Sequence, residues 1–187
     1  MTKLPNFNIQ ATTPLSQSAL QTSCQTFHQA VSKVHRIPYG RNSNKENLGL
    51  VFTENKGTCS TKHAALAQLA IDHDLLEIEL ILGIYKMRES NTPGVGKVLD
   101  QYGLDYIPEA HNYLRWNGQR YDYTKMVHTA DSPFYNLLEE ITITPNQITH
   151  FKVEKHKAFL QKWIKEKSLF FSLDEIWKIR EACIFAL

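Results

Sequence analysis

A cysteine at the predicted start of a helix is the most reactive feature of this sequence. Thr58 can cap a helix over residues 59–71, which places Cys59 in the first turn. Unpaired backbone N–H groups and the helix dipole favour negative charge there, so they stabilise the thiolate, which is the nucleophilic form of cysteine. Gly57 permits a tight approach of the chain, and Lys56 adds positive charge nearby. The pattern indicates a thiol nucleophile, with a small buried cysteine as the alternative.

A predicted β-hairpin supplies two partners for such a thiol. An Asn-Gly pair at 117–118 separates two aromatic-rich runs, which predicts a two-residue turn in which Trp116 faces Gln119. Counting back from the turn puts His111 and Asp122 on one face of the ribbon as diagonal neighbours, with Cβ atoms within about 7–8 Å. An aspartate so placed can orient the imidazole and fix its tautomer. A surface hairpin with incidental polar residues is the alternative interpretation.

Three segments that carry these residues resemble the transglutaminase-like superfamily, whose core is related to that of papain. Residues 57–64 (GTCSTKHA) look like the nucleophile segment of that family. Residues 109–113 (EAHNY) and 118–124 (GQRYDYT) are similar to its histidine and aspartate strands, in the same chain order. Residues 37–39 (IPY) resemble its hydrophobic-tyrosine entry. The resemblance covers about residues 30–125.

The resemblance implies an α+β fold with a papain-like or transglutaminase-like core, in which a central cysteine-bearing helix packs on a small antiparallel sheet. It also implies acyl transfer or hydrolysis through a thioester, with Cys59, His111 and Asp122 as a catalytic triad and no cofactor. The expected partner is a peptide, protein or small amide or ester substrate. Where the family often has His-Ala-Trp, this chain has Asn112-Tyr113 after the histidine, so the substrate class and the acceptor (water or amine) are not fixed.

An oxyanion hole requires two donors near the thiol. The backbone N–H of Cys59 is expected to supply one of them. The second is expected from the loop over residues 39–56, where Tyr39, Asn42 and Asn47 have suitable chemistry. Each of these three side chains could instead pack or form a turn.

Two other interpretations compete with the triad. A zinc site could use Cys59 and His63, one helical turn apart, with His111 and Asp122 as further ligands. No second cysteine follows at ligand spacing, so we expect His63 to pack or hydrogen-bond beside Cys59 instead. A catalytically silent transglutaminase-like module that binds a peptide or protein would keep the fold without turnover.

Composition and charge narrow the class of protein. Lys+Arg 21 against Asp+Glu 19 leaves no concentrated basic face, so no nucleic-acid partner is expected. No apolar run approaches the roughly 18 residues of a membrane helix, and residues 1–14 lack a secretory pattern, so we expect no membrane partner. Three cysteines do not suggest a disulfide framework, and we expect a cytoplasmic protein in which Cys24 and Cys183 are core thiols, with His28 at the rim. The oligomeric state is not predicted.

The length of the chain predicts one domain over residues 1–187. The resemblance implies a transglutaminase-like core over 15–150, which is followed by a helical C-terminal extension over 151–187. Residues 1–14 are expected to form a loose lead-in. The predicted order is a helix at 15–34, a loop at 40–57, a helix at 59–71, a buried strand at 75–87, a turn at 91–96, a short helix at 97–102, a hairpin at 109–124, a strand at 140–144 and helices at 154–167 and 173–185.

Overall fold

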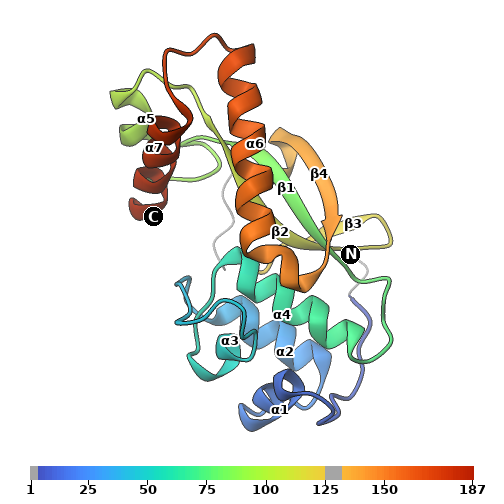
Figure 1. Cartoon of the computed structure of the whole chain (residues 1–187). Coiled ribbons are helices and arrows are strands. Elements are labelled where there is room, and N and C mark those ends of the chain that lie inside the picture. Colours follow the sequence, from blue (N-terminus) through green and yellow to red (C-terminus); the bar gives the residue numbers. More distant parts are fainter. Residues whose placement is uncertain (1–3, 125–131) are drawn as a thin grey trace. The chain divides into compact units, whose positions relative to one another are not determined.

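The computed structural model describes residues 4–124 and 132–187 (Figure 1). In chain order the elements are α1 (Pro14–Gln21), α2 (Phe27–Arg36), α3 (Leu50–Thr53), α4 (Cys59–Ile71), β1 (Glu79–Met87), α5 (Gly96–Gln101), β2 (Ile107–Trp116), β3 (Gln119–Tyr121), η1 (Pro133–Asn136), β4 (Leu137–Ile143), η2 (Pro145–Ile148), α6 (His150–Glu166) and α7 (Leu173–Phe185). The strands form an antiparallel sheet in the order β3-β2-β1-β4. The predicted α+β class is therefore confirmed.

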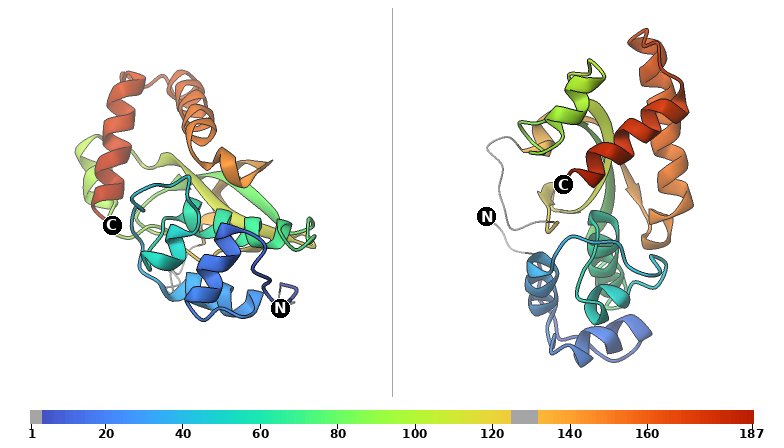
Figure 2. Two further views of the ribbon diagram at one scale, coloured as in Figure 1. Left: turned by 60° about the horizontal axis from the view of Figure 1, so that its bottom comes forward. Right: turned by 90° about the vertical axis from the view of Figure 1, so that its left-hand side faces the viewer.

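Helix α4 lies at the centre of a small helical cluster. It contacts α1, α2, α3 and η2, and the views in Figures 1 and 2 show α1, α2 and α3 gathered around it. The predicted helix over 59–71 and its cap at Thr58 are confirmed. An alanine-rich helix that is apolar on most sides can be approached closely by several neighbours. Its fully or nearly fully buried apolar residues are Ala64, Ala65, Leu66, Ala67, Leu69 and Ala70.

The prediction of one continuous helix over 15–34 was wrong, because the chain forms α1 and α2 with a break between them. Ser23 has φ 66°, which ends the first helix, and Thr26 starts the second with a reciprocal capping box to Gln29. The lead-in is also more ordered than predicted. Ile9 is buried and its backbone N–H donates to the carbonyl of Gln25.

The hairpin forms with the predicted turn and register. Asn117 and Gly118 have φ 48° and 72°, which fits a type I′ turn, and Trp116 pairs with Gln119. Strand β3 ends at Tyr121, so the described ladder stops before Asp122. Strand β1 starts four residues later than predicted because residues 72–77 form turns, whereas β4 starts three residues earlier than predicted.

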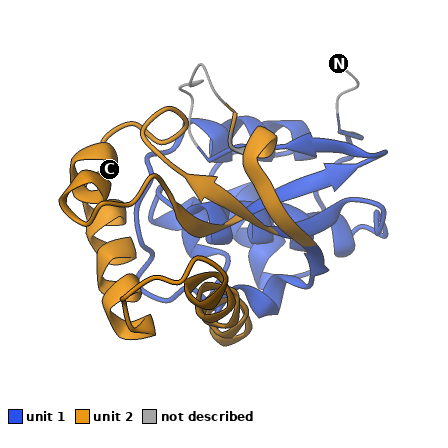
Figure 3. Cartoon of the chain, turned by 90° about the horizontal axis from the view of Figure 1, so that it is seen from above, with its two compact units in different colours: residues 1–82, 112–126, 141–149 blue, residues 83–111, 127–140, 150–187 orange. Residues whose placement is uncertain are grey.

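The described chain divides into two compact units, coloured separately in Figure 3. Apart from undescribed residues, unit 1 contains residues 1–82, 112–126 and 141–149, and unit 2 contains 83–111, 127–140 and 150–187. The C-terminal helices thus belong to unit 2. Among the triad candidates, Cys59 and Asp122 lie in unit 1 and His111 lies in unit 2.

Unit 2 has its own core, in which α7 contacts α5 and α6. Helix α7 has the predicted bounds and the predicted capping box between Ser172 and Glu175. Helix α5 is close to its predicted range, and α6 starts four residues earlier than predicted. No helix in the described residues is long and apolar enough to cross a membrane. The buried core comprises Tyr85, Met87, Val95, Leu99, Leu104, Ile107, Leu160, Trp163, Ile176, Ile179 and Cys183.

Candidate functional site

Cys59 is the first residue of α4, and a complete capping box holds it there. The Thr58 hydroxyl accepts from the backbone N–H of Thr61, and the Thr61 hydroxyl accepts from the backbone N–H of Thr58 at 3.0 Å. The Cys59 side chain is only 8% exposed, and its Sγ lies 3.9 Å from the hydroxyl oxygen of Ser60. The sequence therefore positions a thiol at the positive end of a buried helix.

The segment before the thiol is held by a short backbone bridge. Tyr39 and Gly57 form an isolated parallel bridge, in which the Gly57 N–H donates to the carbonyl of Pro38 at 3.2 Å. A Cβ at Gly57 would lie 2.9 Å from Cγ of Lys62. Glycine is therefore required at this position to let the stem of Lys62 pass beside the backbone.

Lys62 is a buried cation in the site that the sequence analysis did not single out. Its side chain is fully buried, and Nζ donates to the carbonyls of Ile37 at 2.7 Å and Thr124 at 2.8 Å. Burial lowers the pKa of Lys62 to about 8, while the charges of Asp122 and Cys59 act in the opposite direction. The ammonium is therefore the main form at neutral pH. A lysine inside an otherwise apolar helix was the signal that could have revealed it.

Lys56, which the sequence suggested as the nearby positive charge, has a different environment. Its side chain is 42% exposed, and its Nζ lies 4.0 Å from a carboxylate oxygen of Glu54. An exposed pair of this kind is screened by solvent and salt. Lys62, and not Lys56, is the buried positive charge that interacts electrostatically with Cys59.

His63 hydrogen-bonds beside the cysteine, as predicted. Its Nδ1 lies 2.8 Å from the carbonyl of Cys59, and its Nε2 accepts from the backbone N–H of Tyr123 at 2.8 Å. A carbonyl accepts and an N–H donates, so the proton sits on Nδ1 and the ring is neutral. The 3.6 Å separation between Nε2 and an Asp122 oxygen is consequently no ion pair. With both nitrogens engaged, His63 is not placed to ligate a metal or to deprotonate Cys59.

Asp122 lies directly after β3, where its carboxylate organises the following turn. Its Oδ1 accepts from the backbone N–H of Thr124 at 2.9 Å and from the Thr124 hydroxyl at 2.5 Å. The side chain is 25% exposed, and its charge reaches Lys62. Unit 1 therefore brings Cys59, Lys62 and Asp122 into one electrostatic cluster.

His111 lies in unit 2, where its ring makes an edge-to-face contact with Tyr85 at a centroid separation of 6.0 Å. The next residue, Asn112, accepts from the hydroxyl of Ser60 at 3.0 Å and donates to the carbonyl of Ile81 at 3.0 Å. Successive side chains of a strand leave on opposite faces, so His111 leaves β2 on the other face from Asn112. The pairing of His111 with Cys59 stays a prediction.

Asn42, one of the oxyanion candidates, connects the 39–56 loop to α4. Its Nδ2 donates to a carboxylate oxygen of Glu54 and to the carbonyl of Lys56, both at 3.0 Å. Its Oδ1 accepts from the Thr61 hydroxyl at 2.8 Å. The amide of Asn42 thus connects the 39–56 loop to α4, and its role as an oxyanion donor stays a prediction.

The other two oxyanion candidates occupy more exposed positions. Asn47 is exposed, and its Oδ1 accepts from the backbone N–H of Gly49 at 3.2 Å, as in an Asx turn. Tyr39 is 38% exposed, and its backbone lies alongside Gly57, two residues before the thiol. Tyr39 is therefore better placed than Asn47 along the chain, and its role as a donor stays a prediction.

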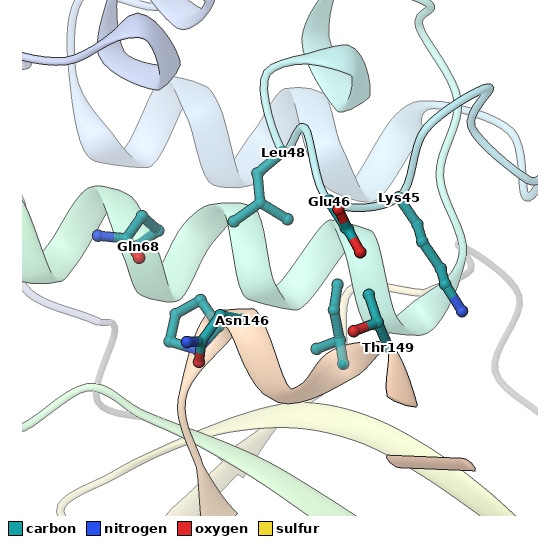
Figure 4. A pocket seen from close by; sticks show the side chains of 8 residues that line it. Lys45, Glu46, Leu48, Gln68, Asn146 and Thr149 are labelled. Carbon is teal, nitrogen blue, oxygen red and sulfur yellow. The ribbon is translucent and has the colours of Figure 1, made fainter. Parts of the chain in front are cut away.

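A separate hollow of about 370 Å³ lies along the same helix (Figure 4). Figure 4 shows side chains of the 39–56 loop above it, Gln68 of α4 beside it and Asn146 below. Gln68 follows Cys59 by nine residues, which is about 13.5 Å along the helix axis. The hollow is therefore distinct from the thiol. Its lining residues are Lys45, Glu46, Leu48, Gln68, Pro145, Asn146, Ile148 and Thr149.

The other two cysteines are core thiols, as predicted. Cys24 is 3% exposed, and burial raises the pKa of its thiol. Cys183 is fully buried, and burial together with the charge of Glu109 raises the pKa of its thiol to about 11. All three cysteines are free thiols. Within residues 4–124 and 132–187, no cluster of three or more His, Cys, Asp or Glu residues could hold a metal ion.

Comparison with known proteins gives this site no precedent. No protein-family model, curated protein or solved structure matches the chain. The transglutaminase-like resemblance therefore stays a prediction that is based on residues 57–64, 109–113 and 118–124. Function has to be argued from the chemistry of the site itself.

Proposed function

We propose that this protein is a cysteine-dependent hydrolase or acyltransferase that acts on an amide or ester through a thioester, on a papain-like or transglutaminase-like core. One observation carries the proposal: Cys59 begins a capped, buried helix and interacts electrostatically with the buried ammonium of Lys62. A helix N-terminus and a neighbouring cation both favour the thiolate, and the thiolate is the attacking form. Cys24 and Cys183 lack this environment.

In the proposed mechanism, His111 takes the proton of the Cys59 thiol and becomes an imidazolium. The Cys59 thiolate attacks the carbonyl carbon, and the carbonyl oxygen becomes an oxyanion stabilised by the backbone N–H of Cys59. Collapse of the tetrahedral intermediate forms the thioester and expels the amine or alcohol, which takes a proton from the imidazolium of His111. Water or an amine then attacks the thioester as His111 removes its proton, and the sulfur leaves as the thiolate. The Asp122 carboxylate stabilises the imidazolium.

His111 is the proposed base because the resemblance assigns it that role and His63 is engaged elsewhere. The adjacent residue Asn112 is hydrogen-bonded to Ser60, so β2 passes the start of α4, although the Asn112 side chain leaves the strand on the face opposite to that of His111. His63, the nearer histidine in sequence, has both ring nitrogens engaged by backbone groups. The base assigned by the resemblance is therefore retained in the proposal.

A catalytically silent binding module is the second candidate, and two observations favour it. Cys59 is only 8% exposed, and strand alternation directs His111 away from the face that carries Asn112. In that function the hollow beside Gln68, with polar groups around Leu48 and Ile148, would contact a peptide. The two candidates differ in one measurable property, which is the reactivity of the Cys59 thiol.

The first test is the rate of Cys59 alkylation by iodoacetamide between pH 4 and 9, read at the peptide level so that Cys59 is separated from the other thiols. The comparison includes His111→Ala and a matched control, His150→Ala, whose side chain is 83% exposed. The proposal expects a rate that is already high near pH 6 and falls to ordinary thiol behaviour in His111→Ala only. A thiol that titrates near its ordinary pKa of about 8.5, indifferent to His111, would favour the silent module.

A second test asks for turnover directly. A p-nitrophenyl ester should acylate Cys59, which mass spectrometry detects as a mass increase on that peptide, and should release nitrophenol continuously. Cys59→Ala should abolish both signals, whereas Cys24→Ala should leave both intact. Release that persists in Cys59→Ala would overturn the assignment of the nucleophile.

A further inference from the structure

We propose that Lys62 is the positioning residue of the thiol site: its ammonium ties two chain segments to the first turn of α4 and supplies the charge that favours the Cys59 thiolate. The inference rests on the proposed function of Cys59 as nucleophile. Sequence alone gave Lys62 no role beyond its place in the 57–64 segment. The structure gives it fixed partners, full burial and a defined electrostatic environment.

The position of Lys62 on the helix places it near the thiol. Residues three apart on a helix are neighbours on its surface, so Lys62 and Cys59 share a face of α4. The Lys62 ammonium then extends to two carbonyls from other segments. Ile37 directly follows α2, and Thr124 follows Asp122 by two residues. The ammonium thereby connects the end of α2, the turn after β3 and the start of the cysteine helix.

Full burial of a charge indicates a role beyond hydrogen bonding. A neutral donor could satisfy two carbonyls without the desolvation penalty of an ammonium. Moreover, the backbone is shaped to admit this side chain, because any Cβ at Gly57 would meet its Cγ at 2.9 Å. The charged or titratable groups that interact with Lys62 are Asp122 and Cys59. We infer that the positive charge itself is what the site retains.

The electrostatic effect works in both directions. Burial lowers the pKa of Lys62 to about 8, and the interactions with Asp122 and then with Cys59 act in the opposite direction. Because a Coulomb interaction is mutual, the same ammonium favours the ionised form of the Cys59 thiol. Below about pH 8 the charge is present, so it acts in the pH range where an ordinary thiol is protonated.

The test compares the pH midpoint of Cys59 alkylation in the unmodified chain, in Lys62→Met and in the matched control Lys56→Met. Lys62→Met should raise the midpoint by at least one pH unit, which lowers the alkylation rate near pH 6 by about tenfold. Lys56→Met removes an exposed lysine three residues before the thiol and should leave the midpoint unchanged. A purely structural role for Lys62 would lower the melting temperature without moving the midpoint, and that result would overturn the proposal.

A measurement on the unmodified chain keeps the proposal testable if Lys62→Met does not fold. Alkylation is measured at low salt and in 1 M NaCl, where the Debye length is about 3 Å. A buried charge is screened weakly, so the midpoint should stay nearly constant. A midpoint that rises toward that of an ordinary thiol in 1 M NaCl would assign the effect to exposed charges and overturn the role of Lys62.

Running Lys62→Met and His111→Ala in one series separates this inference from the proposed function. A low midpoint that is raised by Lys62→Met and unaffected by His111→Ala supports the role of Lys62 and removes His111 as the base. A low midpoint that is raised by His111→Ala alone supports the triad and overturns the role of Lys62. A midpoint near 8.5 in the unmodified chain overturns both.

Discussion

Each unit of this protein holds a cation within electrostatic reach of a cysteine, and the two sites differ in how the cation is paired. In unit 2, Arg180 donates to both carboxylate oxygens of Glu109, at 2.7 Å and 2.5 Å. In unit 1, the Lys62 ammonium donates to two backbone carbonyls. One cation is paired directly with a bidentate carboxylate, whereas the other donates to neutral carbonyls and interacts electrostatically with Asp122 and Cys59.

The pairing decides what each cation does to its cysteine. Burial alone would raise the pKa of Glu109, but Arg180 holds it below its usual range, and Glu109 in turn raises the pKa of Arg180. The resulting carboxylate adds to burial in raising the pKa of the Cys183 thiol. Lys62 instead interacts with Cys59 itself, in a cluster that also contains the carboxylate of Asp122. A perturbed cation that interacts with a thiol is a candidate for a functional role, whereas a bidentate ion pair also occurs as a purely structural element.

The largest expected effect comes from breaking the matched pair. Arg180→Met leaves the buried Glu109 carboxylate without its arginine partner, so the free energy of unfolding should fall by about 3–5 kcal/mol. Urea denaturation followed by circular dichroism measures it. The double variant Glu109→Leu/Arg180→Met removes both charges and should recover most of the loss. A loss of less than about 1 kcal/mol in the single variant would show that the Arg180–Glu109 pair does not stabilise the fold.

A pH dependence of stability should distinguish Lys62 from Arg180. The pKa of Lys62 is lowered from 10.5 to about 8 on folding, so between these values the unfolded chain binds more protons than the folded chain. The contribution of Lys62 to the free energy of unfolding therefore rises by up to about 3 kcal/mol as the pH increases from about 8 to 10.5. This contribution is lost as the pH falls through 8. Denaturation of the unmodified protein and of Lys62→Met at pH 7.5 and 10 measures how the free energy of unfolding changes with pH. The variant should lack the increase that Lys62 contributes.

Thiol reactivity should separate the two cysteines. The pKa of Cys183 is raised from 9.0 to about 11, which lowers its thiolate fraction at pH 7 by about 100-fold. Peptide-level alkylation at pH 7 should therefore label Cys59 at least 100-fold faster than Cys183. In 8 M urea the two rates should converge, because both environments are lost. Comparable alkylation rates of Cys59 and Cys183 in the folded protein would show that Lys62 and Arg180 do not make the two thiols differ in reactivity.

The smallest effect tests the shape of the Lys62 site with two glycines. Gly57→Ala places a Cβ 2.9 Å from Cγ of Lys62 and should cost about 1–3 kcal/mol through overpacking. Gly40→Ala is the matched control, because its nearest contact is 3.4 Å to Cδ of Lys56, an exposed and flexible side chain. Thermal unfolding of both variants measures the difference. Equal stabilities of Gly57→Ala and Gly40→Ala would mean that the Lys62 side chain can move aside at little cost in free energy.

Several elements were predictable because their signals are local. The Thr58 cap, the capping box at Ser172 and the turn at 117–118 each depend on residues a few positions apart, and all three formed as predicted. The helix break near Ser23 was missed because an apolar periodicity ran across it, even though Thr26 and Gln29 carried a capping box. Local cap signals proved more informative there than the hydrophobic period.

For the site, the sequence by itself determined that Cys59 begins an apolar helix, that His63 lies one turn later and that a hairpin follows with Asp122 beyond its turn. Tertiary structure decided which groups these residues meet. The partners of Lys62 at Ile37 and Thr124 are 25 and 62 residues away, and Asn112 meets Ser60 across 52 residues. Backbone carbonyls have no residue-specific signature, so the two acceptors of the Lys62 ammonium emerge only when the chain is folded.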